Sequence, residues 1–453
     1  MISKTTRFEV LDSLRGVCAL LVVLFHLPVS SHLHALALTR HGYLFVDFFF
    51  VLSGFVIAHA YGARLGSGRD VGRFLVRRVG RVWPLHVAVL GGFVVLEFCR
   101  LWFHFDDITA FARDRAPEYL LTNLLLIQAY GIHPYLTWNG PAWSISVEMG
   151  CYVVFGALLL WAPRRFNTWA LLIAVTGALV VLNFAPRFMN TTYSFGFPRA
   201  AYGFFLGCLV HRLWSAGPDL SPRVTGWMEP ISLVTVVAFV SLARGPWEVL
   251  APLLFALSIW VFASEGGAVS RALAARPMIR LGHWSYSIYM THMLVITVML
   301  IAARNLQLMP NGRRVDLGSV WLNDLFSLAV IAFIVGLSAL TYRWIEAPGR
   351  DWINGRLSRK PDAVARPDQT ASSGRHAPVV GVHRRVRLVP QRVLLGVAGA
   401  GGGGDDVNHL LLQPVPDDRQ VRSAVGLARH DDVAAGVHSG CGVEGLSHRR
   451  LSC

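Results

Sequence analysis

Arg15 and His26 lie in the first long apolar run of the chain, LDSLRGVCALLVVLFHL, eleven positions apart. A helix of bilayer length accommodates few ionisable side chains, and those that it carries usually have a function. Eleven residues at about 100° each come to about three turns, so both side chains share a face, about 16 Å apart along the axis. The pair predicts a fixed cation near one side of a membrane and a titratable imidazole near the other.

A structural interpretation of the same pair is also open. An arginine near a helix end can reach the membrane surface and anchor the helix, and a histidine can cap the far end at the interface. For Arg15 and His26 taken alone, anchoring and chemistry are equally compatible with the sequence. Other polar residues within apolar runs are needed to decide between them.

Two carboxylates fall inside later apolar runs. Asp47, in FVDFFFVLSGFVIAHAYG, is expected close in depth to His26, where it would stabilise the imidazolium; a helix cap is the alternative that its position favours. Glu148, in WSISVEMGCYVVFG, is costly at such depth unless it is paired or lines a wet cavity. With Arg15 and His26, both are candidate catalytic residues.

A basic segment, RFLVRRVGRVWPLH, opens the third apolar run. Arg78 and Arg81 are three residues apart and share a helix face, and two guanidinium groups there can hold a phosphate bidentately. Together with Arg77 they are candidate binding residues for an anionic ligand. Positive-inside anchoring or contact with lipid headgroups is the equally common alternative.

Two further polar residues lie near the C-terminal end of the apolar region. His292, in LGHWSYSIYMTHM, is expected near mid-membrane among Ser and Tyr partners, as a satisfied core histidine or as part of a pocket. Glu346, in YRWIEAP, is expected to pair with Arg343 or with a loop arginine. Gly54 is expected to serve close helix packing.

These residues are held by a series of apolar blocks of about 20 residues, which is the length that spans hydrocarbon. The chain has 453 residues, of which 54% are hydrophobic and 15% charged. Ten spans are expected, with the stretch 119–130 too short to cross. They cover about 9–29, 43–62, 80–102, 143–162, 168–185, 197–214, 227–244, 247–264, 284–304 and 321–345.

The net charge of +15 does not indicate nucleic acid, because the arginines gather in short loops between apolar runs, as the topology of membrane proteins requires. With the N-terminus inside, 15 basic residues fall on the cytoplasmic side and 9 on the other. This predicts an N-in, C-in orientation. No spacing of Cys and His predicts a metal site.

The character of the chain changes after about residue 355. From 361 to 453 it contains no Phe, Tyr, Trp, Ile or Met, and it includes the low-complexity stretch GVAGAGGGGDD. Such a segment buries too little apolar surface to offset the entropy of ordering. We therefore expect a transmembrane domain over 1–355 and a disordered cytoplasmic tail over 356–453, in an all-α polytopic membrane protein.

Taken in order, LDSLRGVCALLVVLFH, FVDFFFVLSGFVI, RRVGRVWPLH, WSISVEMGCYVVF, LGHWSYSIYMTH and EAP resemble the integral-membrane acyltransferase-3 family over about residues 8 to 350. Arg15 and His26 match its arginine–histidine pair, Arg78 and Arg81 its Arg-x-x-Arg motif, and Glu148 its glutamate. The chain departs at Met149, where the family often has a second acidic residue, and at Ala347, where it has an arginine before the proline.

The resemblance implies a ten-helix enzyme of the bacterial inner membrane that takes an acyl group from cytoplasmic acyl-CoA. The acyl group expected first is acetyl. The acceptor would be a hydroxyl of a surface glycan, a lipid-linked sugar or a hydrophobic secondary metabolite. Acyl-CoA would be a co-substrate, with no bound cofactor. A transporter or flippase is the alternative, although the sequence lacks the internal repeat between its two halves that is common in that class.

Overall fold

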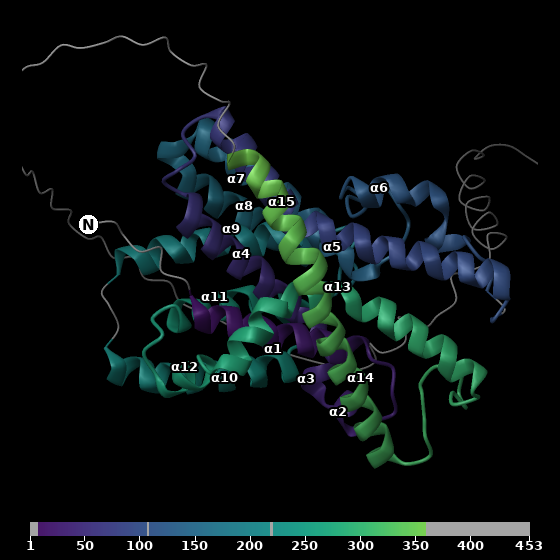
Figure 1. The fold of residues 1–453 in the computed structure, drawn as a ribbon. Helices are drawn as coiled ribbons and strands as arrows, with labels where there is room; N and C mark the ends of the chain where they lie inside the picture. The colour runs from purple at the N-terminus through teal and green to yellow at the C-terminus, as the bar shows by residue number, and fades with distance from the viewer. Residues whose placement is uncertain (1–7, 107, 218–220, 359–453) are drawn as a thin grey trace, which may run out of the picture. The chain divides into compact units, whose positions relative to one another are not determined.

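The computed structural model describes residues 8–106, 108–217 and 221–358. Within these ranges the chain is helical, with one isolated bridge between Val29 and Val315 and no strand. The long helices are α1 (Glu9–His26), α4 (Phe45–Tyr61), α5 (Gly68–Phe103), α7 (Trp143–Trp161), α8 (Phe166–Phe184), α9 (Gly196–Ala216), α10 (Pro222–Leu242), α11 (Ala251–Phe262), α13 (Arg276–Asn305), α14 (Val320–Thr341) and α15 (Ala347–Ser358). The expected all-α class is confirmed (Figure 1).

Shorter helices connect the long ones. They are α2 (His32–Ala35), α3 (Ala37–Arg40), α6 (Leu120–Leu124) and α12 (Ala268–Leu273). The segment 119–130 thus contributes one short helix, α6, and does not cross, as expected. The expected tail lies outside the described residues from 359 onward.

Eight helical segments of the described chain are long and apolar enough to cross a membrane, so the chain is a multi-pass membrane protein. The two other expected spans do form helices, α1 and α9, but these carry more polar residues. Glu9, Asp12 and Arg15 lie on α1, and Arg199 and His211 lie on α9. The expected number of ten therefore differs from eight because of the charged residues on α1 and the lower hydropathy of α9, not because helices are missing.

Helix α5 begins twelve residues earlier than the expected span at 80. The Ser67 hydroxyl accepts a hydrogen bond from the backbone N–H of Asp70 at 3.2 Å, which is the contact that starts a helix at its N-cap. The expected loop before residue 80 is therefore partly helical, and Arg78 and Arg81 are held on one rigid element.

Helices α14 and α15 form one rod (Figure 1), joined by a π-helical turn over Tyr342–Glu346. Such turns insert an extra residue into the helix and occur often at functional sites. Here the turn ends on Glu346, whose side chain is buried.

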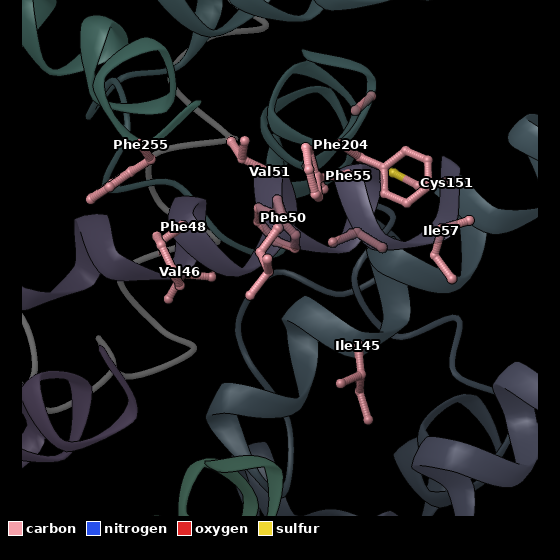
Figure 2. Close-up of a cluster of buried hydrophobic side chains, with 14 of the residues drawn as sticks. Val46, Phe48, Phe50, Val51, Phe55, Ile57, Ile145, Cys151, Phe204 and Phe255 are labelled. Atoms are coloured by element: carbon pink, nitrogen blue, oxygen red, sulfur yellow. The ribbon is translucent and has the colours of Figure 1, made fainter. Parts of the chain in front are cut away.

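Glycines bring α4 and α9 into close contact beside a cluster of buried aromatic side chains (Figure 2). A Cβ atom on Gly54 would lie 1.8 Å from the backbone oxygen of Phe204, and one on Gly207 would lie 1.9 Å from that of Val51. Phe55 and Phe204 are fully buried nearby. The expected packing role of Gly54 is confirmed, since any larger residue would force the two backbones apart.

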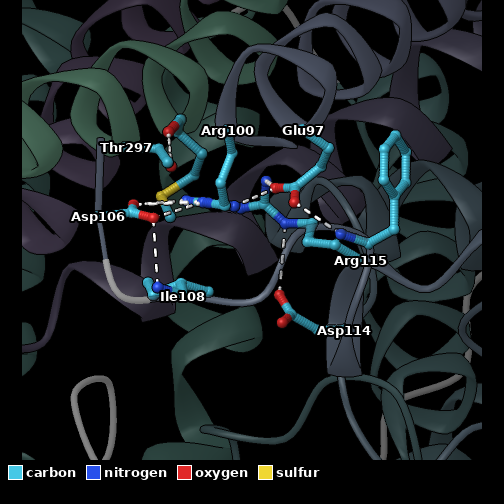
Figure 3. Close-up of polar contacts among 9 residues, drawn as sticks. Glu97, Arg100, Asp106, Ile108, Asp114, Arg115 and Thr297 are labelled. Carbon is cyan, nitrogen blue, oxygen red and sulfur yellow. Dashed lines mark hydrogen bonds and ion pairs between the residues drawn. The ribbon is translucent and has the colours of Figure 1, made fainter. Parts of the chain in front are cut away.

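A buried ionic network fixes the segment that follows α5 (Figure 3). Arg100 pairs with Glu97 and, through Nε, with Asp106 at 2.9 Å. The second oxygen of Glu97 accepts from the backbone N–H of Phe111 at 3.0 Å, and Arg115 lies 3.5 Å from Glu97. The fully buried Glu97 is thus satisfied by partners on both sides of the turn, as a buried carboxylate requires.

Candidate active site

A cavity of about 850 Å³, including its mouth, lies among α1, α4, α5, α7 and α13. Its polar wall contains Arg15, Ser53, Arg78, Arg81, Ser144, Glu148, Tyr152, Ser285, Tyr286 and Tyr289, and its apolar wall contains Phe49, Phe50, Leu52, Val56, Ile57, Val82 and Ile145. Four candidate residues from three separate helices, Arg15, Arg78, Arg81 and Glu148, are therefore brought together.

Arg15 reaches the cavity because α1 and α13 cross at two glycines. A Cβ atom on Gly16 would lie 2.8 Å from the backbone nitrogen of Gly282, so the backbones touch. One residue before this contact, Arg15 donates from Nε to the Ser285 hydroxyl at 2.8 Å and lies 3.1 Å from Asp12. The charge of Arg15 is thus balanced within the chain.

Arg81 is also balanced. It forms an ion pair with Glu346, whose other oxygen accepts from the Ser287 hydroxyl at 2.6 Å. Its guanidinium also lies over the Tyr286 ring, 5.6 Å from the centroid. Glu346 was expected to pair with Arg343 or a loop arginine, and the structure pairs it with Arg81 on α5.

Arg78 differs from the two other arginines of the cavity. It contacts Tyr61, whose hydroxyl lies 3.3 Å from Nη2 and whose ring lies under the guanidinium at 5.4 Å. Its Nε is buried and has no hydrogen-bond partner. Within the described residues no carboxylate lies within ion-pair distance of Arg78, so its positive charge has no ion-pair partner, while Glu148 places a carboxylate elsewhere in the same cavity wall.

Arg77 does not line the cavity and is exposed. One residue corresponds to about 100° of rotation, so Arg77 points away from Arg78. Of the three arginines grouped as candidate anion-binding residues, the cavity therefore uses Arg78 and Arg81 and not Arg77.

Glu148 accepts a hydrogen bond from the Tyr152 hydroxyl at 2.6 Å, and that hydroxyl also lies 3.0 Å from the Ser53 hydroxyl. Tyr152 lies one turn further along the same helix, so α7 itself holds the Glu148 carboxylate where it faces the cavity. Glu148 was expected to be paired or to line a wet cavity, and the structure gives it both a partner, Tyr152, and a place in the cavity wall. Its catalytic role stays a prediction.

Asp47 has a different partner from the one expected. Both of its oxygens accept from Arg199, from Nε at 2.9 Å and from Nη2 at 2.8 Å. Asp47 and Arg199 are almost completely buried, and Arg199 donates as well to the backbone oxygens of Tyr43 and Thr191. Asp47 therefore joins α4 to α9 instead of orienting His26.

His26 ends α1 beyond the cavity wall. Its Nδ1 lies 2.9 Å from the backbone oxygen of Val22, and its ring lies 5.1 Å from the ring of His292. His292 in turn lies 5.9 Å from Tyr289, which lines the cavity. Arg15 and His26 are thus on one helix, as expected, but only Arg15 opens directly into the cavity.

Ser285 and Tyr289 were missed by reading the sequence, whereas His292 was expected as a core or pocket histidine. Ser285, Tyr289 and His292 lie at positions i, i+4 and i+7 of α13 and form the face that meets α1 and the cavity. That spacing is the helical signal that could have found them. Arg199 was overlooked as well, although an arginine inside an apolar run is itself a reason to look for a buried partner.

The fold and site are those of a membrane-embedded enzyme whose cavity, lined by three arginines and a glutamate, lies beside a pair of histidines. The acyltransferase-3 family model, described as an acyltransferase domain, matches residues 8–343. The chain therefore belongs to this family, and it is an acyltransferase that moves groups other than amino-acyl groups.

Curated relatives agree with this assignment. Protein 2 in the picA locus of Rhizobium radiobacter is 34% identical over 206 residues, covering 41% of this chain and 98% of that protein. The peptidoglycan O-acetyltransferase OatA of Listeria monocytogenes is 22% identical over 77% of this chain and 57% of its own length. Acyltransferase MdmB of Streptomyces mycarofaciens is 23% identical over 65% and 80%. No solved structure matches the chain.

The chain thus spans little more than half of the Listeria protein and 50% of the O-acetyltransferase OatA of Staphylococcus aureus, to which it is 23% identical. At the level that the family and the functional names share, it is a membrane acyltransferase.

Proposed function

We propose that this membrane acyltransferase takes an acetyl group from cytoplasmic acetyl-CoA and transfers it to a hydroxyl of a surface glycan or lipid-linked sugar, in the cytoplasmic membrane of a bacterium. The observation that carries the donor assignment is Arg78, whose charge has no carboxylate partner among the described residues and whose buried Nε has no partner. A phosphate group of coenzyme A supplies both the charge and the acceptor oxygens that Arg78 lacks.

Arg15 and Arg81 complete this donor end of the cavity. Their charges are balanced by Asp12 and Glu346, so they orient a phosphate by hydrogen bonding without adding a large excess of positive charge. The apolar wall formed by Phe49, Val56 and Ile57 suits the pantetheine arm. With the phosphates at Arg78, that arm extends along α1 toward His26.

His26 is the base in this proposal. An alcohol attacks a thioester slowly unless its proton is removed as the new bond forms. Because His26 Nδ1 faces the Val22 oxygen at 2.9 Å, Nδ1 carries the hydrogen and Nε2 is left to accept the proton. Tyr289 stands between the cavity and the histidines, so the thioester must pass its ring to reach His26.

The acceptor assignment rests on the relatives. The Listeria relative is named a peptidoglycan O-acetyltransferase, which favours a glycan hydroxyl, and Glu148 in the cavity wall is suited to accept hydrogen bonds from sugar hydroxyls. The name of the Streptomyces relative states only acyltransferase and leaves other hydroxyl acceptors possible for the wider group.

Radiolabelled acetyl-CoA incubated with membranes that contain the wild-type chain or His26→Ala tests the proposal. We expect label in covalent linkage on a glycan with the wild type and a loss of transfer of about 100-fold or more with His26→Ala, at equal amounts of folded protein. Movement of a glycan across the membrane without covalent label would contradict acyl transfer and indicate a transporter. Full activity of His26→Ala would contradict the role of His26.

A further inference from the structure

His292, on α13, has no protein partner for either ring nitrogen although it is completely buried. The backbone oxygens of Ile288 and Tyr289 lie near the ring, but neither completes a hydrogen bond with it. Both oxygens belong to the preceding turn of α13, so a ring that relaxed toward one of them would still leave its other nitrogen unpartnered. The expected satisfied core histidine is therefore not what the structure contains.

This situation is unusual for a buried histidine, because buried polar groups are nearly always hydrogen-bonded and each exception requires an explanation. Elsewhere in this chain the rule holds better. His86, also fully buried, has Nε2 at 2.9 Å from the Asn123 backbone oxygen, so that only its Nδ1 lacks a partner. His59 and His211 satisfy each other, with 3.2 Å between Nδ1 and Nε2. At least one ring nitrogen of His292 is therefore left to bind a group from outside the described chain.

The surroundings of His292 indicate which partner that is. Its ring centroid lies 5.1 Å from that of His26, with the planes inclined at 50°, and 5.9 Å from that of Tyr289. Tyr289 lines the cavity, and its hydroxyl is held by the Pro141 backbone oxygen at 3.1 Å. His292 thus lies between the cavity wall and the proposed base, and a group held at His26 comes within reach of it.

We propose that His292 is a second histidine of the catalytic site and holds the acceptor hydroxyl together with His26. The hydroxyl oxygen accepts a hydrogen bond from a ring N–H of His292 and donates its own hydrogen to Nε2 of His26. Two imidazole rings about this far apart, each with a nitrogen to spare, are suited to bind one hydroxyl as donor and as acceptor. The assignment rests on the proposed function and adds the residue that fixes the acceptor.

In the transfer step the hydroxyl oxygen forms a bond to the acyl carbon while its proton moves to Nε2 of His26. The carbon–sulfur bond then breaks, and its electron pair leaves with the sulfur of coenzyme A. The proton on His26 passes to that thiolate, which gives the free thiol and returns His26 to its neutral form. His292 keeps its proton throughout, since its role is to direct the oxygen lone pair toward the acyl carbon.

The test compares His292→Leu, His292→Gln and His292→Asn in purified full-length protein reconstituted with its native membrane glycans. Radiolabelled acetyl-CoA is the probe, and both its dissociation constant and its transfer are measured per folded molecule. We expect His292→Leu to bind acetyl-CoA within about twofold of wild type and to transfer about 100-fold more slowly, the size of effect of one positioned donor. Of His292→Gln and His292→Asn, the variant whose NH₂ group takes the place of the donating ring nitrogen should transfer about tenfold faster than His292→Leu.

His211→Leu is the matched control, because His211 belongs to the other histidine pair and its nitrogen is bonded to His59; it should transfer at the wild-type rate. Wild-type transfer by His292→Leu, or an equal loss of binding and transfer, overturns the assignment of His292. If His292→Leu does not fold, equal transfer by the two amide variants overturns it. A wild-type chain that transfers no label overturns the proposed function itself, and the role of His292 with it.

Discussion

Arg81 on α5 and Glu346 at the end of the π-helical turn form an ion pair that closes one side of the cavity. The carboxylate is completely buried, and its second oxygen accepts from Ser287. The pair joins residues 265 positions apart. It also explains why the two arginines of one motif differ, since Arg81 is neutralised by the chain and Arg78 is not.

Glu346→Gln should destabilise the protein by about 3 kcal/mol, because removing one partner of a buried pair leaves the other charge uncompensated. Thermal unfolding in detergent, followed by size-exclusion chromatography, measures the loss. Arg81→Gln should destabilise as well. The double variant should lose less than the sum of the two, with a coupling of about 1 kcal/mol or more. Additive losses would mean that the pair does not act as a unit.

Arg78→Gln should weaken the binding of acetyl-CoA without changing the fold. The loss of a charge-assisted hydrogen bond of about 1.5–3 kcal/mol corresponds to a rise of roughly 10- to 100-fold in the KM for acetyl-CoA, with a smaller change in kcat. Initial rates at varied acetyl-CoA measure this. Arg77→Gln is the matched control and should leave KM unchanged, because Arg77 is exposed outside the cavity. Equal effects of both variants would argue against a phosphate at Arg78.

Asp47→Asn should affect stability more than chemistry. Its carboxylate forms two hydrogen bonds with the buried Arg199, so losing its charge should lower the yield of folded protein and the unfolding temperature. The rate per folded molecule should stay close to that of the wild type. Glu148→Gln should behave in the opposite way, with near-normal stability and a transfer rate lower by about tenfold, since Glu148 faces the cavity. A normal fold with lost activity in Asp47→Asn would restore Asp47 to the catalytic site.

The helices and the shared faces along each of them could be predicted from the sequence, because both depend on local periodicity. Arg15 and His26 do lie on one continuous helix, and Arg78 and Arg81 do line one cavity. The partner of each charge could not be predicted. Asp47 pairs with Arg199, 152 positions away, and such pairing is decided by how α4 and α9 pack, not by spacing along either helix.

His34 should make the loop between α1 and α4 less stable in acid. Burial and, after it, the charges of Arg314 and Arg40 lower the pKa of its imidazole from 6.5. Because the folded pKa is the lower one, the unfolded state binds the proton first, and the free energy of unfolding falls as the pH drops below about 6.5. Unfolding temperatures between pH 8 and pH 5 should therefore decline more steeply for the wild type than for His34→Gln. Part of the slope should remain in that variant, because burial also lowers the pKa of His41, and His34→Gln/His41→Gln should be flatter still. Parallel pH profiles for all three proteins would mean that these two histidines do not contribute to acid sensitivity.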